Sequence, residues 1–202
     1  MKEKDLVRMS KIVSTVCSPF LIPVVGLLAL FTFSYLNILQ WQAKLYIFII
    51  FLLFTIMLPI TLIRMYCRYK GWEIKDLKDK EKKLVPFIIC ILSYVAGYYC
   101  LMSNHIAYSI RCIIIAAIVI QILCAIINIW WHISLHTAAI GGILGAIIAF
   151  SWVFSFNPVW WMCIIIILGG LVGTSRMVLK RHTLGQVVAG FLIGTICTII
   201  II

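Results

Sequence analysis

Acidic side chains are missing from the whole second part of the chain. All six lie before residue 82, at Glu3, Asp5, Glu73, Asp76, Asp79 and Glu81. Paired carboxylates for acid–base catalysis, and magnesium ions held by carboxylates from several helices, both need such side chains on more than one segment. The sequence therefore argues against membrane enzymes that handle prenyl diphosphates through two Asp-rich magnesium motifs.

Metal-binding cysteine motifs are missing as well. The eight cysteines form no CxxC pair, and no group of cysteine and histidine has the spacing of a zinc site. Because these cysteines lie inside or at the ends of apolar runs, we expect free, buried thiols. The sequence predicts neither a metal nor a cofactor.

Charged residues as a whole are scarce, and apolar residues take their place. Charged residues make up 11% of the chain, against about a quarter in an ordinary soluble domain, and apolar residues make up 64%, against about half. The apolar residues form runs that are long enough for about six to seven spans of roughly 20 residues each. We therefore predict an all-α, polytopic bundle of transmembrane helices, which forms a single integral membrane domain over residues 1–202.

The apolar runs and the polar segments between them give the order of the predicted spans. The spans lie at about 12–35, 45–65, 86–101, 108–130, 134–153, 159–173 and 182–202. Residues 1–11 form a basic leader, and residues 66–85 form a polar, lysine-rich loop. The first run is too long for a cleavable signal segment. It contains Pro19 and Pro23, so we expect its first half to be kinked or broken.

The 17 lysines and arginines are divided unequally between the two sides of the membrane. With seven spans, 15 of them share one side, and only Lys44 and Arg111 lie on the other. Since basic loops stay in the cytoplasm, this bias predicts a cytoplasmic N-terminus in a bacterial inner membrane. The net charge is +11, but the basic residues lie in short loops that offer no folded surface for binding nucleic acid. We therefore expect membrane lipids rather than nucleic acid as partners. Whether the chain forms a homo-oligomer stays open.

Pairs of glycines four residues apart recur in the last three predicted spans. They are Gly141 and Gly145, Gly169 and Gly173, and Gly190 and Gly194. Such pairs let helix backbones approach closely in a bilayer, which supplies no hydrophobic force between helices. We expect these three spans to form a tight bundle that holds the polar junctions at their ends together.

Two polar clusters open the fifth and the seventh spans. NIWWHISLHTAAIGG places Ser134 and His136 at a helix start, where free N–H groups and the helix dipole attract anions. GTSRMVLKRHTLGQ combines Arg176 with His182. Both helices start on the predicted cytoplasmic face, where the lysine-rich loop also ends. An arginine fork and histidines at a membrane boundary suit the phosphate group of a lipid.

Both clusters resemble motifs of the type 2 phosphatidic acid phosphatase family. SRMVLKRH resembles the third motif, in which five residues separate Ser-Arg from His and three more separate His from Asp. ISLHT resembles the second motif, Pro-Ser-Gly-His, and DLKDKEKKLVP loosely resembles the first, in which six residues separate Lys from Arg-Pro. The resemblance covers about residues 75–194 and implies a phosphatase-type core over residues 86–202.

The resemblance implies metal-independent hydrolysis of a lipid phosphate or diphosphate. His182 would be the nucleophile that forms a phosphohistidine, and His136 would protonate the leaving group. Arg176, together with Ser134 and Ser175, would bind the phosphoryl oxygens. Two histidines can divide these roles without a metal, and a loose phosphoryl transition state needs positive charge around its equatorial oxygens.

Several positions depart from the family pattern. Gln186 stands where the family has aspartate. The side-chain carbonyl of Gln186 lies one helical turn from His182 and could accept the Nδ1 hydrogen of that histidine. A neutral amide cannot, however, neutralise the charge of an imidazolium. Lys78 occupies the lysine position of the first motif, and Lys83 is the candidate for its missing cation, so both would bind substrate phosphate. The remaining departures are Ile133 and Leu135 in the second motif and Val85 in the first.

Two other functions stay open. A relative with weakened catalysis would bind or move anionic lipids, and Gln186 and Val85 favour this alternative. A channel or transporter for small anions has little support, because the ionisable groups gather at one membrane face instead of along a path. His105 and His132 are interpreted as interfacial residues without a role, and Lys180 and Arg181 as anchors that reach the headgroups.

Overall fold

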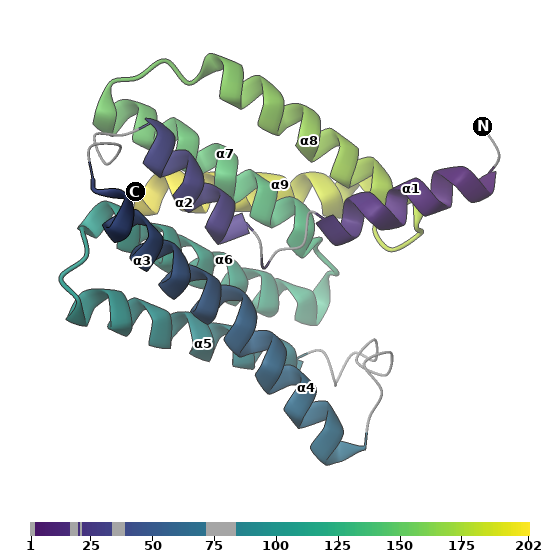
Figure 1. Cartoon of the computed structure of the whole chain (residues 1–202). Coiled ribbons are helices and arrows are strands. Elements are labelled where there is room, and N and C mark those ends of the chain that lie inside the picture. Colours follow the sequence, from purple (N-terminus) through teal and green to yellow (C-terminus); the bar gives the residue numbers. More distant parts are fainter. Residues whose placement is uncertain (1–2, 17–19, 21, 34–38, 72–83) are drawn as a thin grey trace.

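The chain folds into a bundle of helices, described here from a computed structural model (Figure 1). The structure describes residues 3–16, 20, 22–33, 39–71 and 84–202. In chain order, the elements are α1 (Glu3–Val16), α2 (Ile22–Phe33), α3 (Trp41–Leu52), the π-helix η2 (Leu53–Met57), α4 (Leu58–Lys70), α5 (Leu84–Ser103), α6 (Tyr108–Trp130), α7 (Leu135–Phe154), α8 (Val159–Val178) and α9 (Leu184–Ile201). No strand occurs within the described ranges, and the predicted all-α class is confirmed.

Six of the helical segments are long and apolar enough to cross a membrane. They are Trp41–Lys70, Val85–Ser103, Tyr108–Trp130, Leu135–Phe154, Val159–Val178 and Leu184–Ile201. Their number lies within the six to seven predicted spans. The chain is therefore an integral membrane protein with a polytopic helical bundle.

The first apolar run is broken, as its prolines predicted. α1 includes most of the basic leader, so the leader is not a separate polar segment, and α2 starts only at Ile22. Pro23 lies in the first turn of α2, where a residue without an N–H group costs no helical hydrogen bond; Pro19 lies outside the described residues. With 12 residues, α2 is about 18 Å long, which is shorter than the hydrocarbon core of a bilayer.

The second apolar run forms one long helix with a π-helical stretch at its centre. The stretch η2 ends two residues before Pro59. Pro59 has no N–H to donate to the Thr55 carbonyl four residues earlier, and its ring crowds that carbonyl, so the helix widens there. The Thr55 hydroxyl donates to the Phe51 carbonyl at 2.6 Å. The helix ends at Gly71, whose φ of 66° is the left-handed conformation that favours glycine.

Helix α7 is the centre of the bundle. In its most apolar window, 72% of the residues are buried, against 22–33% in the other five candidate spans. α7 contacts α2, α6, α8 and α9, and its longest contact is with α9. The bundle is therefore built around α7, and the position of its N-terminus is set by its neighbours.

Glycines bring the backbones of α7 and α9 into direct contact. A Cβ atom added to Gly141 or Gly145 would collide with the backbone carbonyl of Phe191 or Thr195 on α9. In the opposite direction, a Cβ atom on Gly194 would collide with the Ala138 carbonyl on α7. The predicted tight packing of the last three spans is confirmed, and it is closest between α7 and α9.

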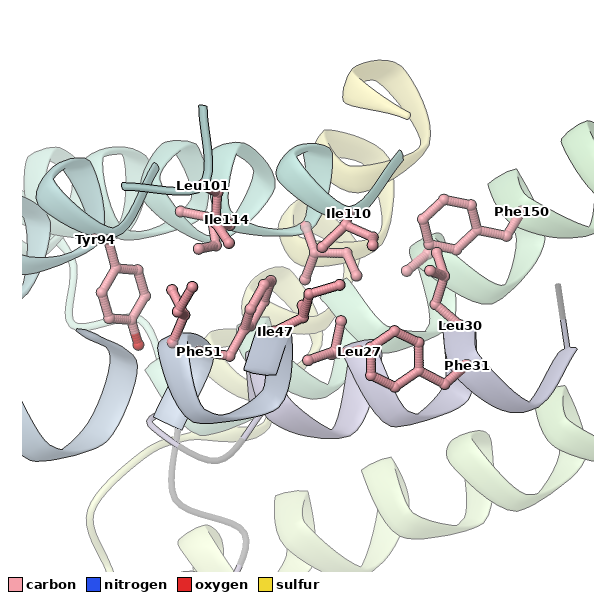
Figure 2. Close-up of a cluster of buried hydrophobic side chains, with 13 residues drawn as sticks. Leu27, Leu30, Phe31, Ile47, Phe51, Tyr94, Leu101, Ile110, Ile114 and Phe150 are labelled. Atoms are coloured by element: carbon pink, nitrogen blue, oxygen red, sulfur yellow. The ribbon is translucent and has the colours of Figure 1, made fainter. Parts of the chain in front are cut away.

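A large apolar cluster holds the other helices against α7. Figure 2 shows Leu27 of α2, Phe51 of α3, Tyr94 of α5, Ile114 of α6 and Phe150 of α7 within this cluster, and all five are nearly or fully buried. α6 thereby packs against both α5 and α7. This packing positions the end of α6, from which the chain turns into α7.

The glycine contact predicts a specific loss of stability. In Gly194→Ala, the new methyl group would overlap with a backbone carbonyl, which cannot rotate away. We expect this overpacking to cost about 1–3 kcal/mol, and hence to lower the melting temperature by about 2–10 °C. A thiol-reactive dye that reports exposure of the buried Cys112 and Cys124 in detergent would measure the change.

Gly170→Ala is the matched control, because a Cβ atom at Gly170 meets nothing within 4 Å. Alanine is favoured over glycine inside a helix by about 1 kcal/mol, so this variant should melt at or above the native temperature. Equal melting temperatures for the two variants would contradict the close contact between α7 and α9.

Candidate active site

The glycine contact between α7 and α9 brings two polar connections to the same end of the bundle. Residues 131–134 join α6 to α7, and residues 179–183 join α8 to α9. Figure 1 shows both connections at one end, beside α1 and the C-terminal end of α8. The polar residues that flank these connections therefore lie close together, although they are about 40–50 residues apart in the sequence.

A hydrogen-bonded turn ends α8 and directs the chain toward His182. The Lys180 N–H donates to the Met177 carbonyl at 2.8 Å, and the Arg181 N–H donates to the Arg176 carbonyl at 3.1 Å. Lys180 adopts a φ of 52°. These two hydrogen bonds, together with a left-handed residue directly after the helix, form a Schellman motif, which satisfies the last carbonyl groups of a helix.

His182 is oriented by a backbone carbonyl. Its Nδ1 lies 3.2 Å from the carbonyl oxygen of His132. A carbonyl oxygen can only accept, so Nδ1 carries the hydrogen and Nε2 keeps its lone pair. We expected the Gln186 side chain to accept this hydrogen. Gln186 does interact with His182, with a smaller effect than the His132 carbonyl, and its Oε1 accepts the Thr183 N–H at 3.0 Å.

Gln186 therefore has a local structural partner. With Thr183 it forms a capping box, in which each side chain accepts a hydrogen bond from the backbone of the other residue. The box satisfies N–H groups in the first turn of α9, directly after His182. Gln186 fixes the start of α9. The hydrogen on Nδ1 of His182, for which we expected the side-chain oxygen of Gln186 as acceptor, is accepted by the His132 carbonyl.

The surroundings of His182 favour its neutral form. Burial lowers the pKa of this histidine below its ordinary value of 6.5, and the positive charge of Arg176 lowers it further. The hydrogen bonds to the His132 carbonyl and to Gln186 raise the pKa, but the lowering effects prevail. The imidazole of His182 is therefore predominantly neutral at pH 7.

His136 lies in the first turn of α7, on the other side of the same site. Its ring has a hydrogen bond with the backbone of Ser14, and it interacts electrostatically with Arg176 and His182. Its Nδ1 is buried and has no hydrogen-bond partner among the described residues. The structure thus brings the two predicted catalytic histidines within interaction range of each other.

Ser134 is the N-cap of α7 and is fully buried. A serine at this position normally uses its hydroxyl to accept an N–H from the first turn of the helix. Here the Oγ makes no such bond, and it has no partner within the described part of the chain. The Ser134 backbone lies against Gly190, where an added Cβ would stand 2.8 Å from the Ser134 carbonyl oxygen. α9 therefore packs closely against the backbone at the start of α7.

Arg176 lies in the last turn of α8 and is 7% exposed. Its Nη1 donates to the Ser14 hydroxyl at 2.8 Å, whereas its buried Nε has no partner among the residues that the structure describes. Ser175 is also buried, but its hydroxyl donates to the Leu171 carbonyl of its own helix at 2.7 Å. Of this Ser-Arg pair, the arginine is the one with an unused donor.

His136, Arg176 and His182 lie within electrostatic interaction range of one another, and Ser134 lies two residues before His136 at the start of α7. The roles predicted for these residues stay predictions. Lys78 and Lys83 lie outside the described residues. No group of histidine, cysteine or acidic side chains with metal-site geometry occurs in the described ranges.

Two contributors were not predicted from the sequence. Ser14 belongs to α1, far from both motifs, and the Ser10/Ser14 pair on one face of a helix is the only local signal for it. His132 was interpreted as having no role, and its contribution comes from its carbonyl group. A side-chain pattern cannot reveal a backbone acceptor.

Comparisons with known proteins place part of the chain in a family. The family model described as the PAP2 superfamily matches residues 89–202, which extend from α5 to the C-terminal end of α9. Of the residues at the site, only Ser14 lies before this range. Neither the comparison with curated proteins nor that with solved structures gives a match.

The environment of His182 predicts its titration. We expect its modification by diethyl pyrocarbonate, which attacks neutral imidazole, to have a midpoint below pH 6.5, because the folded pKa is lowered. Arg176→Gln removes one lowering charge and should move the midpoint toward 6.5. His182 of the unfolded chain binds its proton at a higher pH than His182 of the folded protein. The free energy of unfolding should therefore decrease as the pH falls below 6.5. Mass spectrometry of the His182 peptide measures the midpoint, and a value above 6.5 in the native protein would contradict this environment.

Proposed function

The chain belongs to the PAP2 superfamily, and on this premise we propose that it is a metal-independent membrane phosphatase for a lipid phosphate or diphosphate. The observation that carries the proposal is the orientation of His182. Its Nδ1–H group points to the His132 carbonyl, which leaves the Nε2 lone pair available to attack phosphorus. Burial lowers the pKa of His182, so this lone pair is present at neutral pH.

We assign the two chemical steps to the two histidines. In the first, His182 Nε2 forms a bond to phosphorus, the P–O bond to the lipid breaks, and His136 gives a proton to the departing oxygen. In the second, His136 takes a proton from water, whose oxygen attacks the phosphohistidine. The P–N bond then breaks, which releases inorganic phosphate, returns His182 to its neutral form and leaves His136 protonated for the next cycle.

The donors around the histidines suit the phosphoryl group. The unused Nε of Arg176 and the unused hydroxyl of Ser134 are the donors that would bind its oxygens. Arg181 interacts electrostatically with both Arg176 and His136 and adds positive charge. No carboxylate exists between residues 82 and 202 to neutralise these cations. Ser175 is buried beside Arg176 in the sequence, and its hydroxyl hydrogen is already donated within α8. This hydroxyl can therefore accept a hydrogen bond at the site but has no hydrogen left to donate to a phosphoryl oxygen.

The position of the site at the end of the membrane spans supports a lipid substrate. Trp130 and Trp131 are exposed beside the site, and Trp152 and Trp160 are exposed near the other end of α7 and α8. Tryptophan side chains favour the two membrane interfaces. The 20 residues of α7 separate the two groups by about 30 Å. The site therefore lies at the level where a lipid carries its phosphate.

We further propose that this end faces the cytoplasm of a bacterial inner membrane. The last turn of α8 carries Arg176, the connection to α9 carries Lys180 and Arg181, and α1 adds Arg8 and Lys11 at the same end. Cytoplasmic loops of inner-membrane proteins carry such an excess of positive charge.

The proposed reaction predicts phosphate release without a divalent metal. Purified protein should release phosphate from a lipid phosphate in excess EDTA, and His182→Ala should lower kcat by about 10³-fold or more, because the nucleophile is lost. A colorimetric phosphate assay in mixed micelles measures both. The matched control is His105→Asn, which keeps a residue suited to the φ of 52° at the exposed turn between α5 and α6. Full activity in His182→Ala would overturn the mechanism.

One observation favours a second candidate function, that of a catalytically weakened relative that binds or moves anionic lipids. Gln186 stands where the family pattern has aspartate, and its Oε1 is occupied by the Thr183 N–H. A neutral amide cannot stabilise the imidazolium character that His182 acquires when it attacks. In this alternative, Arg176 and Ser134 would still hold a lipid phosphate without efficient turnover.

Gln186→Asp separates the two functions. An aspartate there keeps an acceptor in the first turn of α9 and adds a negative charge near His182. If turnover in the native protein is weak, we expect this variant to raise kcat, by up to about 10⁴-fold by analogy with carboxylate-to-amide changes in serine hydrolases. High native turnover together with little response to Gln186→Asp would exclude the weakened relative.

A further inference from the structure

Helix α1 contributes to the site although it lies outside the part of the chain that matches the family. The match begins at residue 89, whereas α1 ends at Val16. Figure 1 shows α1 at the end of the bundle that carries the α8–α9 connection, and α8 is the helix that it contacts most. The helix therefore reaches the end of the bundle that carries the site from outside the matched range.

The face of α1 that packs against the bundle is polar at two positions. Ser10 and Ser14 are both buried, with 6% and 9% exposure, and they lie one helical turn apart. Val13, on the same helix, packs against apolar residues of α7 and α8. On the outer face, Met9 and Ile12 are exposed. The docked face of α1 thus carries two small hydroxyl side chains beside the apolar Val13.

One of the two serines is bonded to the site. The Ser14 hydroxyl accepts the Arg176 Nη1–H at 2.8 Å in a buried contact, and the Ser14 backbone has a hydrogen bond with His136. Ser10 is buried to a similar degree, but it is not the partner of the Arg176 Nη1 or of His136. A single residue of α1 therefore contacts both the predicted phosphate-binding cation and the predicted general acid.

A neutral partner suits an arginine that must keep its charge for a ligand. An arginine side chain has many rotamers, and a buried guanidinium is commonly fixed by a carboxylate, which also neutralises it. No acidic residue follows residue 81 in this chain. The Ser14 hydroxyl fixes one edge of the guanidinium through Nη1 and leaves the buried Nε unused. The fork is thereby oriented while its full positive charge stays available.

We propose that Ser14 of α1 is a positioning residue that orients Arg176 for the phosphoryl group and completes the site from outside the matched part of the chain. This inference rests on the proposed phosphatase function. It predicts that substrate binding and turnover depend on a hydroxyl at position 14, beyond any contribution of Ser14 to stability.

The test compares Ser14→Ala, Ser14→Thr and the control Ser10→Ala in the full chain. Ser14→Ala should lower kcat/KM by about tenfold or more, since a hydrogen bond to a charged group is lost. Inhibition by orthovanadate, a phosphate mimic, should weaken in parallel. Ser14→Thr keeps the hydroxyl and should restore most of both, whereas Ser10→Ala, at an equally buried serine, should leave both unchanged.

A second measurement needs no turnover. Phenylglyoxal modifies accessible arginines, and mass spectrometry of the Arg176 peptide gives its rate. We expect Arg176 to react faster in Ser14→Ala than in the native protein, Ser14→Thr or Ser10→Ala, because its guanidinium is no longer held. If the native protein releases no phosphate, the proposed function fails, and this rate still tests the orientation of Arg176. Equal rates in all four proteins, or equal losses in Ser14→Ala and Ser10→Ala, would overturn the role of Ser14.

Discussion

The contact between the backbones of α7 and α9 is the constraint on which the site depends. Gly141, Gly145 and Gly194 have no side chains, and a side chain at any of these positions would keep the two helices apart. A bilayer supplies no hydrophobic force between helices, so close van der Waals contact is the main attraction available. Because the helices touch along their length, the residues at their N-termini, Ser134 and His182, are held at one end of the bundle.

The polar groups of the site are held by neutral partners. His182 is oriented by a backbone carbonyl, Arg176 by a serine hydroxyl, and the start of α9 by an amide side chain, that of Gln186. A carboxylate in any of these places would reduce the positive charge that attracts a phosphate. The absence of acidic residues after position 81 therefore has a physical counterpart in how the site is built. It leaves the cations unneutralised at one end of the membrane spans.

The arrangement also shows how a segment outside the family match can reach the site. The PAP2 superfamily match covers α5 to α9, which contain both histidines and the arginine. α1 approaches the C-terminal end of α8 from outside this range and buries Arg176. A buried arginine has few rotamers left, so a helix that covers it can also decide its direction. Such an addition changes the site without changing any of its motifs.

The sequence by itself determined the helical class, the last six of the seven predicted membrane spans and the candidate residues of the site. Hydropathy and glycine spacing are local patterns, and a bilayer permits few structures other than packed helices, so Gly194 and His182 could be interpreted before any fold was known. Only the tertiary structure decided the partners of these residues. The His132 carbonyl and the Ser14 hydroxyl reach the site through contacts between distant segments. Every residue has a carbonyl, and serines are common, so neither contact leaves a pattern in the sequence.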